Sequence, residues 1–115
     1  MDTFTSLESE LLDRLIQKYP VLKSHIPFLQ VVSRQASPEG MIVNITYRDL
    51  ETKPEPSDID ALFSNQERIH VKGLKNGLGY VIDVTDGEIQ FIEFMTYDEK
   101  WNGKFDDYKI VKKED

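Results

Sequence analysis

The chain of 115 residues contains no cysteine, and this absence excludes disulfide bonds, thiolate zinc sites and a cysteine nucleophile. It also lacks the long hydrophobic run of about 20 residues that a membrane-spanning helix requires. The first residues, Met1-Asp2-Thr3-Phe4, place no basic segment before an apolar stretch, so we expect no secretory signal peptide. Together these absences predict a cytoplasmic protein with no membrane association.

Basic residues are few: 14 Lys and Arg stand against 21 Asp and Glu, which gives a formal net charge of −7. Nucleic-acid recognition depends on Lys and Arg that neutralise phosphates, so we expect no direct nucleic-acid partner. Most of the acidic excess falls between residues 39 and 67, where seven acidic residues face two basic ones. This segment is either a solvated loop or a docking surface for a basic protein partner. In the docking interpretation the partner-binding residues are Asp49, Glu51, Glu55, Asp58 and Asp60.

The common signatures of phosphate loops, dinucleotide sites, zinc proteases and serine hydrolases are also missing. We therefore expect no cofactor, no metal and no catalytic residue, and the first interpretation is a non-catalytic protein. The apolar content of 39% with 10% aromatic residues is too high for a disordered chain. The length suits one domain with one core over residues 1–115.

Apolar side chains near the N-terminus repeat with the period of a helix. The spacing predicts an amphipathic helix over residues 6–19, with a capping box that begins at Thr5 and a stop at Pro20. The apolar stripe consists of Leu7, Leu11, Leu12, Leu15, Ile16 and Tyr19.

From residue 28 onward the period changes to two, which is typical of strands. We expect strands over residues 28–37 and 41–48, joined by a turn at Pro38-Glu39. Residues 49–57 contain two prolines and should be a loop, and residues 57–63 form a short helix in this interpretation. Residues 105–112 are the candidate for a sixth strand.

Two dipeptides, Asn76-Gly77 and Asp86-Gly87, are strong signals for two-residue hairpin turns, because a type I′ turn needs positive φ at both central residues. They predict a three-stranded meander of residues 68–75, 78–85 and 88–96. The fold class is therefore α+β, with the N-terminal helix packed on a mainly antiparallel meander sheet of five or six strands.

Two-residue turns fix the register of the meander. The second turn pairs Tyr80 with Glu93, and the first pairs Gly73 with Tyr80. The remaining pairs bring apolar residues to one face: Val84 with Ile89, Ile82 with Phe91, Leu78 with Met95, Ile69 with Val84, and Val71 with Ile82.

In this register Glu93 lies among apolar side chains on the face that should pack against the helix. A carboxylate there is paired, protonated or at an opening. Gly73, Tyr80 and Glu93 then form a notch, with Arg34 as the candidate counter-ion if the Pro38-Glu39 turn has two residues. A three-residue loop would turn Arg34 outward. The notch is either a structural ion pair or a small-molecule binding or hydrolytic site.

Residues 73–101 resemble a pattern in small uncharacterised bacterial domains, some of which are similar to immunity proteins that neutralise secreted toxins. The matching features are Gly77-Leu78-Gly79-Tyr80, the Asp86-Gly87 turn, and the apolar-Glu-aromatic step at Ile92-Glu93-Phe94 followed by Tyr97 and Trp101. The resemblance implies a small acidic binding protein, most concretely an immunity-type inhibitor of a basic toxin. The alternative is the ligand site at Tyr80, Glu93, Arg34 and Gly73.

Overall fold

The structure is a computed structural model that describes residues 3–64, 67–105 and 107–112. Its N-terminal helix forms where the sequence predicts it. Helix α1 spans Ser6–Lys18. The Thr5 side chain accepts a hydrogen bond from the Glu8 backbone N–H, and the Glu8 carboxylate accepts one from the Thr5 N–H. This reciprocal capping box satisfies two donors that the first turn leaves free. The predicted helix is confirmed, one residue shorter than expected.

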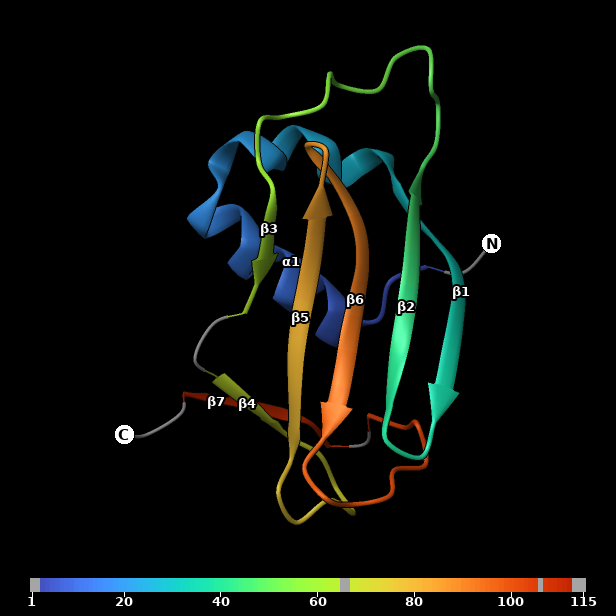
Figure 1. Ribbon diagram of the computed structural model, residues 1–115, viewed down its shortest axis with the longest axis vertical. Coiled ribbons are helices and arrows are strands. Elements are labelled where there is room, and N and C mark those ends of the chain that lie inside the picture. Colours follow the sequence, from blue (N-terminus) through green and yellow to red (C-terminus); the bar gives the residue numbers. More distant parts are fainter. Residues whose placement is uncertain (1–2, 65–66, 106, 113–115) are drawn as a thin grey trace.

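After Tyr19 the chain continues as a 3₁₀ helix, η1, over Pro20–Phe28. A 3₁₀ helix has three residues per turn, so Leu22 and His25 lie on one face, and both are buried. Figure 1 shows α1 and η1 on the same side of the sheet, behind the strands.

Within the described residues one antiparallel sheet contains seven strands, in the order β1-β2-β6-β5-β4-β7, with β3 beside β5 off this path (Figure 1). The α+β prediction is confirmed, and the short strand β3, which was not expected, brings the sheet above the expected five or six strands. The strands are β1 Leu29–Ser37, β2 Gly40–Tyr47, β3 Ala61–Phe63, β4 Glu67–His70, β5 Leu78–Thr85, β6 Glu88–Thr96 and β7 Lys109–Lys112.

Two short segments differ from the expected elements. The helix predicted over residues 57–63 is wrong, because the last three of these residues pair with β5 as strand β3. Free backbone donors and acceptors along β5 outweigh the weak local helix signal. The uncertain strand at 105–112 is present in part as β7, which pairs with β4; Asp106 lies outside the described residues.

The two predicted turns of the meander have different outcomes. Asp86 and Gly87 have φ values of 53° and 78°, and Thr85 pairs with Glu88, so this two-residue hairpin is confirmed. The hairpin at Asn76-Gly77 is wrong. Among these two residues only Gly77 has positive φ, whereas a type I′ turn needs both.

A longer loop therefore replaces the first turn. Ile69 pairs with Leu78, and β4 pairs with β7 along its whole length, from Glu67 to His70. The place beside Ile82–Val84 of β5, which the prediction gave to residues 69–71, is taken by β3. The pairs predicted from this turn, including Gly73 with Tyr80, are wrong for this reason.

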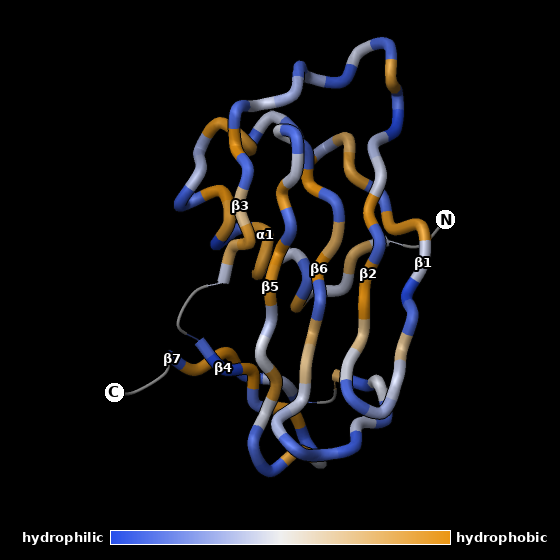
Figure 2. Tube along the Cα trace, in the orientation of Figure 1, coloured by the Kyte–Doolittle hydropathy of each residue, from blue (hydrophilic) through white to orange (hydrophobic). Residues whose placement is uncertain are grey.

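The core lies between the helices and one face of the sheet, here called the inner face. Hydrophobic segments of α1 and of the central strands run through this layer, whereas the loop between β2 and β3 is hydrophilic (Figure 2). The side chains of Leu7, Leu11 and Leu15 are fully buried, which confirms the predicted apolar stripe. The opposite face of the sheet is called the outer face. No helix in the described part of the chain is long and apolar enough to span a bilayer.

Candidate functional site

The carboxylate of Glu93 lies on the outer face, not in the core. In β6 the pairing runs from Val84 with Ile89 to Asp83 with Phe91, so Gln90 is the extra residue of a β-bulge. Beyond the bulge every side chain of β6 changes face relative to the prediction. Glu93 pairs with Val81 instead of Tyr80.

The buried Tyr80 has a different carboxylate partner. It pairs with Phe94 on the inner face and is 1% exposed. Its hydroxyl donates to Glu67 Oε1 at 3.2 Å. The Arg14 Nε donates to both Glu67 oxygens at 3.0 Å, so this cluster ties α1 to β4 and β5.

The predicted counter-ion Arg34 also lies on the inner face, because the turn at Pro38-Glu39 has two residues and Ser37 pairs with Gly40. Its partner is Glu8, which is fully buried. The Arg34 side chain donates to Glu8 Oε1 at 2.7 Å and to Oε2 at 3.0 Å. The register of β1 shifts between Val31 and Ser33, which leaves Val32 61% exposed although it lies two residues before Arg34.

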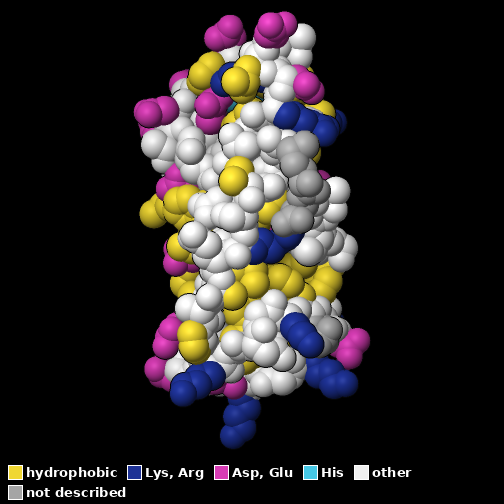
Figure 3. Space-filling view, turned by 90° about the vertical axis from the view of Figure 1, so that its right-hand side faces the viewer, with side chains coloured by type: hydrophobic (Ala, Val, Ile, Leu, Met, Phe, Trp, Pro, Cys, Tyr) yellow, Lys and Arg dark blue, Asp and Glu magenta, His cyan; other side chains and the backbone are white. Residues whose placement is uncertain are grey.

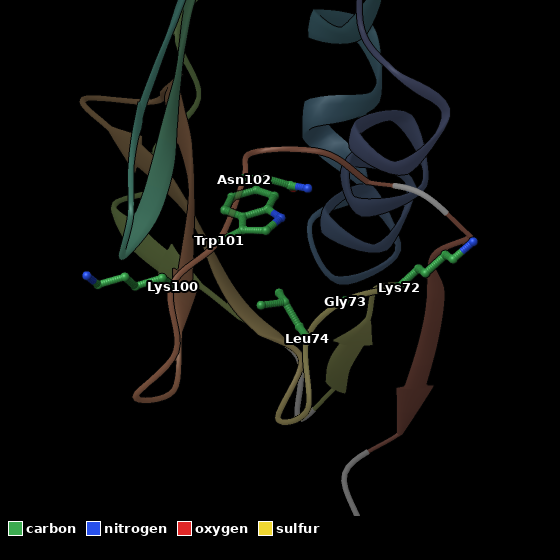
Figure 4. Close-up of a pocket in the computed structure, with 6 residues that line it drawn as sticks. All are labelled: Lys72, Gly73, Leu74, Lys100, Trp101 and Asn102. Carbon is green, nitrogen blue, oxygen red and sulfur yellow. The ribbon is translucent and has the colours of Figure 1, made fainter.

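The fourth residue of the predicted notch, Gly73, lies in the loop between β4 and β5 with φ of 97° and no atom near its missing side chain. It lines a small hollow of about 120 Å³ beside Leu74 and Trp101. Figure 4 shows Lys72 and Lys100 extending to opposite sides, away from this hollow. The structure therefore separates Gly73, Tyr80, Glu93 and Arg34, and the pairing that defined the notch is wrong.

The five predicted partner-binding carboxylates do lie close along one segment. Residues 49–60, here called the acidic loop, connect β2 to β3 and extend beyond one end of the sheet (Figure 1). Acidic side chains gather at this end of the molecule in Figure 3. Leu50 is 67% exposed between two acids. The exposed carboxylates are those of Asp49, Glu51, Glu55, Asp58 and Asp60.

Hydrogen bonds form a turn at the start of the acidic loop and hold its end in place. At its start the Asp49 carbonyl accepts from the N–H groups of Thr52 and Lys53. At its end the Ser57 N–H and Oγ both donate to the Gly87 carbonyl at 3.0 Å. The Asp60 carboxylate accepts from the Asp86 N–H at 3.0 Å. The loop is therefore fastened to the β5–β6 turn.

An ion pair holds the middle of the acidic loop. Lys53 pairs with Glu88 of β6, and its ammonium lies 5.3 Å from the centroid of the Tyr47 ring, within the range of a cation–π contact. The one cation of this loop is therefore engaged internally, which leaves the exposed surface of the loop acidic.

Sequence reasoning missed a buried polar network beneath the loop. The His25 Nδ1 lies 2.7 Å from the Tyr47 hydroxyl, which accepts from the Ile89 N–H at 2.9 Å. Burial raises the pKa of Tyr47 to about 12, so the phenol stays protonated. Its hydroxyl donates a hydrogen bond to His25 Nδ1. The signal in the sequence is the spacing of three between Leu22 and His25, which a helical turn brings to one side.

Burial also lowers the pKa of His25, and the Lys53 charge lowers it further. The hydrogen bond to the Glu55 backbone and the nearby Glu88 carboxylate both raise this pKa, but the effect of burial is the largest. The imidazole is therefore neutral, with Nδ1 as acceptor. Because the ring contacts both β2 and the backbone at Glu55, it joins the core to the acidic loop.

A second hollow of about 300 Å³ lies near the β1–β2 turn, and its lining includes Gln35, Ile42, Glu93 and Met95. It opens beside Glu93 on the outer face. Among the described residues no group of His, Asp and Glu side chains is arranged to hold a metal ion.

The fold and these surfaces define a small acidic α+β protein in which helices cover one face of an antiparallel sheet and a fastened acidic loop extends from one end. Comparison with known proteins gave no match to a family model, a curated protein or a solved structure. The resemblance of residues 73–101 to immunity proteins therefore stays a prediction.

Proposed function

We propose that the protein is a non-catalytic binding module whose acidic loop docks onto a basic protein, most concretely as an immunity-type inhibitor of a basic bacterial toxin. The observation that carries this proposal is the exposure of five carboxylates on a loop that hydrogen bonds and an ion pair hold in one place. A loop that is already ordered loses less conformational entropy on binding than a mobile one.

Charge and shape of the loop have separate roles in this proposal. The carboxylates accelerate the encounter with a positive surface through electrostatic steering. Leu50, exposed between Asp49 and Glu51, supplies the apolar contact that desolvated interface centres require. The partner therefore combines a basic surface with an apolar recess.

The test uses co-expression with a toxin encoded beside the gene, followed by stopped-flow association of the purified pair. We expect the association rate to fall steeply with added salt, because screening shortens the range of the attraction. A variant with Asp49, Glu51, Glu55, Asp58 and Asp60 changed to their amides should lose protection and rapid association. The amide at position 60 keeps the oxygen that caps Asp86.

The matched control changes four exposed carboxylates outside the loop, those of Asp13, Glu39, Asp98 and Asp107, to amides. This variant should protect cells like the parent, because its charges lie away from the docking loop. If the loop variant binds as tightly and as fast as the control variant, the proposal is wrong.

A further inference from the structure

The outer face of the sheet is unusually apolar for a surface that no helix covers. Figure 1 shows both helices on the opposite side of the strands. The register places Ile42 of β2, Val81 of β5 and Phe91, Glu93 and Met95 of β6 together on this outer face. All five side chains are half-buried.

Strand β6 carries apolar residues on both of its faces. After the bulge at Gln90, Ile92 and Phe94 point into the core and are fully buried, whereas Phe91 and Met95 point outward. Strands with one solvated face alternate apolar with polar residues, and strands covered on both faces are apolar throughout. The sequence of β6 is thus that of a strand with a second covering layer.

Glu93 is the exception at the centre of this face. Ile42 and Val81 are its neighbours on the two adjoining strands. Within the described residues its carboxylate makes no hydrogen bond or ion pair. A half-buried carboxylate among apolar groups is stabilised when an incoming cation pairs with it.

The charge around Phe91 and Glu93 is of one sign. The cross-strand rows that contain Phe91 and Glu93 include Asp83 and no Lys or Arg. Along the middle of the left margin of Figure 3, where this face is seen edge-on, hydrophobic and acidic side chains alternate. At the lower end, Arg68 is already stacked on the Tyr97 ring at 4.4 Å.

We propose that the outer face is a second docking surface, which binds a protein segment that carries an Arg or Lys between apolar side chains. The cation lies against Glu93 and enters the hollow of about 300 Å³ beside it, and the flanking apolar groups cover Phe91, Val81 and Met95. A second copy of this chain does not complement the face, because its own acids would meet Glu93 and Asp83. The proposal goes beyond the function proposed above, since it does not involve the acidic loop.

The test selects short random peptides displayed on phage against the full chain and measures the binding of the enriched peptides by calorimetry. We expect these peptides to carry an Arg or Lys flanked by apolar residues. Binding should weaken roughly tenfold or more with Phe91→Ser and with Glu93→Lys. The matched control, Leu50→Ser on the acidic loop, should bind them like the parent.

A charge exchange separates a direct contact from a general loss of structure. An enriched peptide whose basic residue is replaced by Glu should bind Glu93→Lys more tightly than it binds the parent. The charge exchange relies on a substitution at the surface, so it tests the proposal even if Phe91→Ser does not fold.

Three results would overturn the proposal: no enriched peptide, peptides without a basic residue, or binding that ignores both Phe91→Ser and Glu93→Lys. Sedimentation of the parent chain as a dimer that Phe91→Ser dissociates would show that a second copy covers the face, and would also overturn it. The variant with a neutralised acidic loop should still bind the peptides, so this proposal and the proposed function can fail independently.

Discussion

Two carboxylates of this protein, Glu8 and Glu93, have opposite environments. Glu8 is fully buried, caps α1 and receives two hydrogen bonds from Arg34. Glu93 is half-buried without a partner among the described residues. A buried charge that loses its partner costs more free energy than a solvated one, so the two residues should respond differently to neutralisation.

The first prediction compares Glu8→Gln with Glu93→Gln. Glu8→Gln should lower the free energy of unfolding by about 1.5–3 kcal/mol, because Arg34 keeps its charge and loses the carboxylate, while glutamine preserves the cap. Glu93→Gln should change it by less than about 0.5 kcal/mol. Urea unfolding at neutral pH measures both. Equal losses would contradict the assignment of Arg34 to Glu8.

At the scale of elements, the β5–β6 hairpin both sets the register of the sheet and anchors the acidic loop. Its turn residue Gly87 has a φ of 78°. A Cβ added there would lie 1.9 Å from the Ser57 carbonyl oxygen. The loop therefore packs directly against the turn, where only glycine leaves room.

The second prediction compares Gly87→Ala with Gly73→Ala. Gly73 also has positive φ, but a Cβ there meets no atom within 4 Å, so its substitution should cost only the strain of about 1–2 kcal/mol. Gly87→Ala should cost this strain and also displace Ser57, and thus be the more destabilising change. Thermal unfolding gives the stabilities, and hydrogen exchange at Ser57 reports the contact. Similar losses at both positions would show that the loop does not pack on the turn.

At the scale of the whole molecule, the His25 network connects parts that are far apart in the sequence. The imidazole lies in η1, the Tyr47 phenol in β2, and the Ile89 N–H in β6. The groups that face His25 are Tyr47, Glu88, Lys53 and the Glu55 backbone. Protonation of His25 would place a proton against the Tyr47 hydroxyl and weaken the hydrogen bonds that connect the core to the acidic loop.

The third prediction concerns the pH dependence of stability. Because the folded pKa of His25 lies below its usual value of 6.5, the unfolded chain binds a proton that the folded chain does not. The stabilisation is fully present above pH 6.5. It is lost as the pH falls toward the folded pKa, by up to about 1.4 kcal/mol per pH unit.

The measurement is the difference in unfolding free energy between the parent and His25→Gln from about pH 7 to about pH 5. This difference should shrink as the pH falls. The matched control is His70→Gln, which removes an exposed histidine of β4 instead of the buried one in η1. A difference that stays constant with pH would mean that His25 does not titrate below its unfolded pKa.

Much of the fold follows from local patterns. Helix α1, the strands β1 and β2, the turn at Pro38-Glu39 and the hairpin at Asp86-Gly87 lie where the sequence predicts them, because each depends on residues only a few positions apart. The candidate site was less predictable. The exposure of the acidic loop follows from its composition. The predicted pairing of Tyr80 with Glu93, in contrast, fails because the bulge at Gln90 shifts the register of β6 by one residue.

The sequence by itself determined the α+β class, the acidic excess in one loop and the elements whose signals are short-range. Only the tertiary structure decided which face Glu93 occupies, which carboxylate binds Arg34 and which strand lies beside β5. The physical reason is that a bulge such as that at Gln90 adds one residue wherever packing favours it, and strand pairing follows the summed contacts of both sheet faces. Neither the position of such a bulge nor the summed contacts of the two faces can be read from a short stretch of the chain.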